Sequence, residues 1–144
     1  MKKLFTLLAV IVTIAINAQA PSFSVKPNYG SIIEGSPITL TFTLSAANNA
    51  NTVINIATSD GTATVSDYAA TTSTITIPAG QTTYTISIAT TNDAIPETSE
   101  YFTLNATVTS GNTSNVSYVA RITITDNDTI PTLTSYVSSN TSPW

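Results

Sequence analysis

Alternation of apolar and polar residues is the feature that most constrains the fold of this chain. Over residues 38–44 every second residue is apolar, and the residues between them are all threonine. The same two-residue period recurs over 84–88 and 102–108. Side chains of a β-strand point alternately to the two faces of its sheet, so this pattern predicts strands with one buried face. After residue 20 no stretch has the period of a helix, which predicts an all-β domain.

Strands are predicted wherever such runs lie between turn residues. Turn signals such as Pro78 to Gln81 separate the runs. The predicted strands cover residues 22–26, 37–45, 52–58, 73–78, 82–90, 100–109 and 117–125. Seven short strands at this spacing predict an immunoglobulin-like antiparallel β-sandwich of two packed sheets.

Residues 1–20 have the pattern of a secretory signal peptide. Lys2 and Lys3 precede an apolar run over residues 4–16, and Ala18 and Ala20 supply the small residues of a cleavage site after residue 18 or 20. The run is shorter than the roughly 20 residues that a membrane-spanning helix needs. We therefore expect a secreted or cell-surface protein with no membrane span after cleavage.

The remainder of the chain is predicted to form one domain over residues 21–128, followed by a polar segment over 129–144. Within that segment, Pro131 and the three residues after it resemble Pro21 to Ser24 at the start of the domain. The segment is either a simple polar tail or the start of a truncated second repeat.

The charge balance and the missing residue types exclude several functions. Removal of the signal leaves Lys26 and Arg121 against eight acids, a net charge of −6. Nucleic acid is not an expected partner, because its binding depends on Lys and Arg that neutralise phosphates. The 144 residues include no Cys and no His, which removes disulfides, zinc sites of thiolate and imidazole, and Cys-His or Ser-His catalysis.

The acids gather in one half of the predicted connections. Successive connections of an antiparallel sandwich alternate between its two ends. The connections predicted at 46–51, 78–81 and 110–114 contain no acid. All eight acids fall at the other end: Glu34, Asp60, Asp67, Asp93, Glu97, Glu100, Asp126 and Asp128. Like charges at one end of a domain repel each other, and a divalent cation bound by six to eight oxygens is the simplest way to neutralise them. Calcium suits such a set of loops better than magnesium does.

The segments that carry these acids also resemble a known family, the Calx-beta domains of sodium/calcium exchangers and many bacterial surface proteins. The resemblance covers about residues 22–128. It is carried by IIEGSPITLTFTLS at 32–45, SDGTATVSDYAATTSTITIPAGQTTYTISI at 59–88, NDAIPETSEYFTLN at 92–105 and ITITDND at 122–128.

The resemblance implies a set of calcium ligands. Six acids match ligand positions of the family: Glu34, Asp67, Asp93, Glu97, Asp126 and Asp128. Glu100 matches a position that binds or orients the ions, and Asn127 stands where the family often has a further acid. Asp60 has no counterpart and is interpreted as a turn residue before Gly61. Fewer acids follow the fifth predicted strand than in many members, which implies fewer or more weakly bound ions.

Three classes of function are compatible with such a domain. The favoured class is a calcium-binding extracellular structural or adhesion module, whose partners are calcium and a neighbouring repeat or an extracellular ligand. The alternative is a carbohydrate-binding β-sandwich, but the exposed aromatic strip that is typical of that class is not evident. A hydrolase that uses Glu97 and Glu100 as acid and base is the third. We expect no enzymatic activity, because these acids are better placed for a metal.

Overall fold

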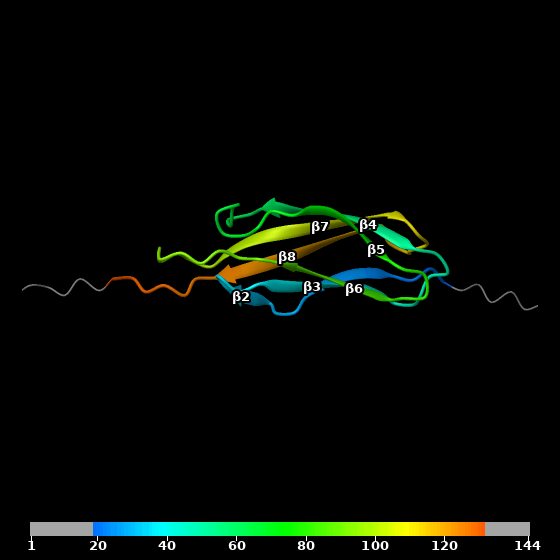
Figure 1. Cartoon of the computed structure of the whole chain (residues 1–144), viewed down its shortest axis with the longest axis horizontal. Helices are drawn as coiled ribbons and strands as arrows, with labels where there is room; N and C mark the ends of the chain where they lie inside the picture. The colour runs from blue at the N-terminus through cyan, green and yellow to red at the C-terminus, as the bar shows by residue number, and fades with distance from the viewer. Residues whose placement is uncertain (1–18, 132–144) are drawn as a thin grey trace, which may run out of the picture.

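Eight strands in two facing sheets make up the part of the chain that the structure, a computed structural model, describes: residues 19–131 (Figure 1). The strands are β1 (Phe23–Pro27), β2 (Ser31–Ile33), β3 (Ile38–Leu44), β4 (Thr52–Asp60), β5 (Thr72–Ile77), β6 (Thr83–Ile88), β7 (Glu100–Ser110) and β8 (Ser117–Thr125). The predicted all-β sandwich is confirmed, and each of the seven predicted strands lies within about two residues of its expected place. Most of the predicted signal peptide and polar tail, residues 1–18 and 132–144, lies outside the described residues.

The two sheets have the orders β1-β3-β6 and β2-β8-β7-β4-β5. Every pairing is antiparallel except that of β2 with β8, which is parallel. The strand β2 was not predicted, because it has only three residues and no alternation that could reveal it. It arises where the chain leaves one sheet after Pro27 and joins the edge of the other, at β8. Its register sets Ile33 beside Thr125, so Glu34 lies next to the end of β8.

The core lies between the sheets and follows the alternation of the sequence. All four apolar residues of β3 are buried, while its threonines are only partly buried. Tyr68 and Phe102 stack face to face with ring centroids 3.9 Å apart. Burial of a large apolar side chain contributes about 1.5–3 kcal/mol to the free energy of folding. The chain has no Cys, so the core stabilises the domain without disulfides.

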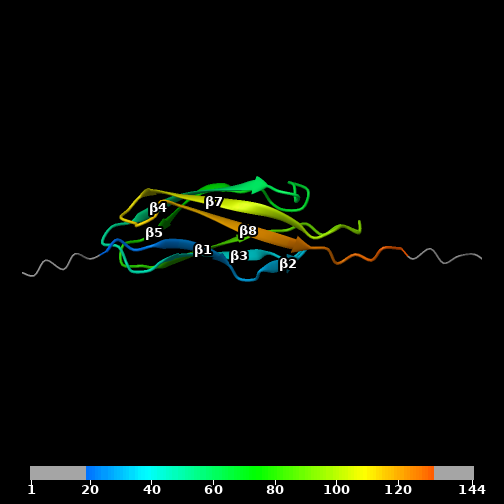
Figure 2. The same ribbon diagram turned by 180° about the vertical axis from the view of Figure 1, so that it is seen from behind.

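The strand registers gather the acid-bearing connections at one end of the sandwich. Asp60 at the end of β4 pairs with Phe102 near the start of β7, and Glu100 pairs with Ile124 near the end of β8. We call this end the acidic pole. Figure 2 shows that β1 begins near the opposite end and that the chain leaves at the acidic pole after β8. Within residues 19–131 no helix has the length and hydropathy of a membrane crossing.

Candidate metal centre

Six carboxylates at the acidic pole form two groups of three. In each group, one oxygen from every acid lies within 4.8 Å of the others. The Glu34 group consists of Glu34, Asp93 and Asp128, and the Asp67 group consists of Asp67, Glu97 and Glu100. Neither group is contiguous in sequence. The Glu34 group joins three separate segments, whereas the Asp67 group joins the β4–β5 loop to Glu97 and to Glu100 at the start of β7. Such a separation is short enough for one cation to contact all three acids.

The Glu34 group contains buried oxygens without a partner. Glu34 is only 7% exposed, because its backbone N–H donates to Thr125 O at 3.1 Å and holds the residue against β8. Its Oε1 atom and the Oδ2 atom of Asp128 are both buried, and neither accepts a hydrogen bond from any residue between 19 and 131. Burial raises the pKa of Glu34, and the neighbouring charges of Asp128, Asp126 and Asp93 raise it further. Buried carboxylates of this kind are stable when a cation supplies the missing partner.

The turn after Glu34 brings the first group together. Gly35 has a φ of 74°, and a Cβ atom there would lie 2.8 Å from the Cβ of Asn92. Only glycine satisfies both conditions without strain. The turn can therefore approach the loop between β6 and β7, which carries Asp93. In that loop, Asp93 Oδ1 accepts a hydrogen bond of 2.7 Å from Ile95 N.

Within the Asp67 group, Asp67 itself is held by a network of hydrogen bonds. Asp67 Oδ2 accepts from Thr64 N at 2.7 Å and from Thr64 Oγ1 at 3.2 Å, and its Oδ1 accepts from Ser66 Oγ at 3.1 Å. Burial raises the pKa of Asp67, but these hydrogen bonds outweigh that effect and the pKa is lowered. Burial and the charges of Asp67 and Glu97 raise the pKa of Glu100. Asp67 thus remains ionised in this group, ready to contact a cation.

Glu97 is electrostatically coupled to both groups. Burial raises its pKa, and the charges that add to this effect are those of Asp93, Asp67, Asp126 and Asp128, in that order. Two of these four acids belong to the Glu34 group and one to the Asp67 group. The charge of an ion bound in either group would therefore affect the ionisation of Glu97.

Two predicted ligands lie in neither group. Asp126 accepts backbone hydrogen bonds at both oxygens, from Glu97 N at 2.7 Å and from Asp128 N at 2.8 Å. These bonds lower its pKa despite partial desolvation. Asn127 donates its amide N–H to Asn92 Oδ1 at 2.8 Å. Both side chains tie the segment after β8 to the β6–β7 loop, so they position Glu97 and Asp128 in this structure.

The remaining acid, Asp60, is engaged elsewhere. The hydroxyl of Tyr68 donates to Asp60 Oδ1 at 2.6 Å, and Asp60 belongs to neither group. Sequence reasoning missed the residues that orient the acids, chiefly Thr64, Ser66 and Asn92. The motif T-x-S-D at 64–67 is a signal for the first two, because Thr and Ser hydroxyls commonly bond to an acid within the same turn.

The fold is an all-β sandwich domain, and loops at one end of it carry two groups of carboxylates that form a candidate cation site. The sequence profile of the Calx-beta domain family matches residues 17–128, so the chain belongs to this family and the predicted resemblance is confirmed. Calx-beta domains are calcium-binding regulatory or structural domains rather than a family of enzymes. They occur in membrane-associated or extracellular proteins.

Two solved structures illustrate the shared fold. The apo-form Calx CBD1 domain superposes with a TM-score of 0.59 at 16% identity, over 74% of this chain and 99% of that chain. The structure of CBD12 from CALX1.2 gives a TM-score of 0.60 at 17% identity, over 73% of this chain and 46% of that chain. Identities this low support a common fold and nothing finer. No curated protein matches the chain by sequence.

Proposed function

We propose that this chain is an exported calcium-binding structural or adhesion module, whose ions hold the loops of the acidic pole together. The observation that carries the proposal is the pair of buried, partnerless oxygens, Glu34 Oε1 and Asp128 Oδ2, in a group of three acids. A buried carboxylate with no partner costs several kcal/mol in typical proteins, and a bound cation removes that cost.

The two groups supply two candidate ion sites. Glu34, Asp93 and Asp128 would hold one ion, and Asp67, Glu97 and Glu100 would hold another, with Glu97 coupled to both. Backbone carbonyls and water would complete the coordination, as is usual for calcium. Asp126 and Asn127 are retained as proposed contributors, because they fix the loops that carry Glu97, Asp93 and Asp128.

The donor set favours calcium over other metals. Every candidate ligand atom is oxygen, and the chain has no Cys or His to offer zinc or copper a softer ligand. The ligands come from four parts of the fold: the turn after β2, the β4–β5 loop, the β6–β7 loop with the first residue of β7, and the segment after β8. Calcium accepts the variable geometry of such loops, whereas magnesium demands a nearly ideal octahedron.

A bound ion would cross-link these segments and stiffen the end of the domain from which the chain continues. This is the property expected of a spacer or adhesion module at the cell surface, and the predicted signal peptide supports export. The carbohydrate-binding alternative has less support, since Tyr68 is buried against Phe102 and Tyr118 packs on Phe23. These rings are not available to stack on a sugar.

Calorimetric titration of the mature chain with calcium and with magnesium tests the proposal. We expect saturable calcium binding and much weaker magnesium binding. The double variant Glu34→Gln, Asp67→Asn removes one charge from each group and should abolish binding at the same calcium concentrations. A wild-type domain that takes up no calcium at millimolar concentration would overturn the proposed function.

A further inference from the structure

Exposed aliphatic side chains accompany the candidate ligands at the acidic pole. Isolated exposed aliphatics are common on protein surfaces, but here they recur on every segment that carries a ligand. The four residues are Ile33 before Glu34, Val65 before Asp67, Ile95 between Asp93 and Glu97, and Ile130 after Asp128. Apolar side chains gathered around a polar site are typical of a surface that docks on a partner.

Ile95 is the one of these residues that lies between two candidate ligands on the same loop. It lies in the connection between β6 and β7, which projects beyond the neighbouring loops in Figure 1. Its backbone N–H donates to Asp93 Oδ1, and two residues later Glu97 N donates to Asp126 Oδ2. The side chain of Ile95 is 60% exposed on a turn that is fixed on both sides. A preorganised apolar tip of this kind loses little entropy when it binds.

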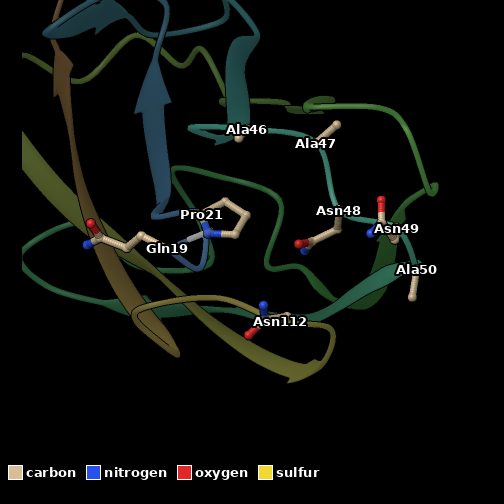
Figure 3. Close-up of a pocket in the computed structure, with 8 residues that line it drawn as sticks. All are labelled: Gln19, Pro21, Ala46, Ala47, Asn48, Asn49, Ala50 and Asn112. Atoms are coloured by element: carbon tan, nitrogen blue, oxygen red, sulfur yellow. The ribbon is translucent and has the colours of Figure 1, made fainter. Parts of the chain in front are cut away.

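The opposite pole offers a pocket of about 340 Å³ (Figure 3). The pocket lies between the N-terminal segment, the β3–β4 loop and the β7–β8 turn. Its lining combines apolar groups with amides and includes no charged side chain: Pro21, Ala46, Ala47, Ala50, Asn48 and Asn112. Asn48 is buried and fixed, since its side-chain amide donates to Thr52 Oγ1 at 2.7 Å and its backbone carbonyl accepts from Gly80 N at 2.9 Å.

We propose that the calcium-loaded acidic pole of one copy docks head to tail on the opposite pole of a second copy, with Ile95 entering this pocket. The proposal rests on the proposed calcium binding, because uncompensated carboxylates could not be brought against another protein surface. Charge selects the orientation. A contact between two acidic poles would oppose like charges, whereas the pocket pole contains no acid at all.

The described residues begin and end at opposite poles of the domain, which is compatible with a head-to-tail row of copies. The described chain begins beside the pocket, at Gln19, and leaves at the acidic pole (Figures 1 and 2). Each copy therefore presents both halves of the contact, at opposite ends. A heterologous contact of this kind does not close on itself and extends into a linear assembly.

A membrane surface fits the acidic pole less well than a second copy does. Residues that seat proteins at a membrane interface are typically Trp, Tyr, Lys and Arg. Of these, the four ligand-bearing segments contain only Tyr68, which is buried in the core. The two cationic side chains of the described residues, Lys26 and Arg121, belong to strands β1 and β8.

Sedimentation velocity of the chain from Gln19 onward, over a range of concentrations in calcium and in EDTA, tests the proposal. We expect concentration-dependent association in calcium only. Ile95→Ser removes the apolar tip, and Asn112→Tyr fills the pocket without adding charge, so each variant should associate at least about tenfold more weakly. A mixture of the two should form a one-to-one complex, because one variant retains the pocket and the other retains the tip.

Val119→Ser is the matched control, since Val119 is 59% exposed but lies on β8. It should associate as the wild type does. Melting curves and calcium titration of every variant separate loss of folding or of calcium binding from loss of docking. Calcium binding without association would overturn the docking and leave the proposed function intact. Loss of association in Ile95→Ser but not in Asn112→Tyr, or calcium-dependent binding of the monomer to phosphatidylserine vesicles, would also overturn it.

Discussion

The Glu34 group and the Asp67 group have equal numbers of carboxylates but are held in different ways. Asp67 accepts hydrogen bonds from Thr64 and Ser66, and these keep it ionised in place. Glu34 has a buried oxygen with no partner, and its pKa is raised by burial and by the acids around it. The Asp67 carboxylate is preorganised by protein hydrogen bonds, whereas the buried oxygens of Glu34 and Asp128 have no partner among the described residues.

This difference has consequences for the ion-free domain. Protein hydrogen bonds hold the Asp67 carboxylate whether or not a cation is present, although burial and nearby charges raise the pKa of Glu97 and Glu100. In the Glu34 group, mutual repulsion opposes the fold until a cation binds. We therefore expect calcium removal to disturb the turn after β2 and the segment after β8 more than the β4–β5 loop. The following predictions would sharpen or break that distinction.

Calcium withdrawal should have the largest effect. A ligand that binds only the folded state at a hundredfold excess over its dissociation constant stabilises it by about 2.7 kcal/mol. For a domain of this size that corresponds to a shift in melting temperature of about 10 °C. Thermal melts in calcium and in EDTA measure the shift. Amide exchange should show that Glu34 N, which donates to Thr125 O, loses more protection than Thr64 N. Equal loss at both amides would contradict the comparison.

Gly61→Ala should destabilise the Asp67 side of the pole. A Cβ at Gly61 would overlap the ring and the carbonyl oxygen of Tyr101, and the backbone there is fixed by Ala63 N donating to Tyr101 O. Overpacking of this kind costs about 1–3 kcal/mol. Urea unfolding of the ion-free variant measures this cost.

Gly35→Ala is the counterpart on the Glu34 side. Its positive φ and its contact with Asn92 predict strain of about 1–2 kcal/mol. Calcium titration should show weaker binding, because the turn after Glu34 must move away from the β6–β7 loop. A Gly35→Ala variant with unchanged stability and affinity would show that this close approach does not build the site.

Sequence reasoning predicted those parts of the fold and site that depend on local pattern. The alternation over 38–44 predicted a half-buried strand because burial there follows the pleat of the sheet. The shared pole followed from the alternation of connections. The sequence could not predict which acids form which group, because the grouping depends on how loops that are distant in sequence approach each other in the fold. Asp126 looks like Asp128 in sequence, yet one is bonded to backbone N–H groups at both oxygens and the other has a buried free oxygen.

Asp128→Asn and Asp67→Asn should affect the ion-free domain in opposite directions. The first removes a charge beside Glu34 and supplies an amide that can donate to it, so stability without calcium should rise. The second replaces a carboxylate that accepts hydrogen bonds at both oxygens by an amide with a single acceptor oxygen, at a cost of about 1 kcal/mol. Both should weaken calcium binding by at least about tenfold, because each removes a ligand charge. Unfolding and titration of both variants give the two readouts. If both substitutions destabilise the calcium-free domain, the proposed difference between the Glu34 group and the Asp67 group is wrong.

The pH dependence of stability should reverse sign with calcium. Glu34, Glu97 and Glu100 have folded pKa values above the ordinary 4.5, so their ionisation opposes folding as pH rises through those values. Asp67 and Asp126 are lowered from 3.8, and their contribution is lost only below that value. Between pH 7 and about 4.5, the ion-free domain should therefore become more stable on acidification. In calcium it should become less stable, because protons compete with the ion. Parallel curves in the two buffers would refute this prediction.

Asp60→Asn should have the smallest effect of all. Asp60 lies at the same pole as the ligands, but it belongs to neither group, and its oxygen accepts a hydrogen bond from Tyr68. The side-chain oxygen of Asn can accept the same bond, so packing of Tyr68 on Phe102 should be kept. Only the long-range field at the ions changes, and salt screens that field within about 10 Å. Calcium titration at 0.1 M salt should give an affinity within about twofold of wild type. A loss as large as that of Asp128→Asn would mean that charge at the pole matters more than the positions of its carboxylates, and the division into two groups would have no functional meaning.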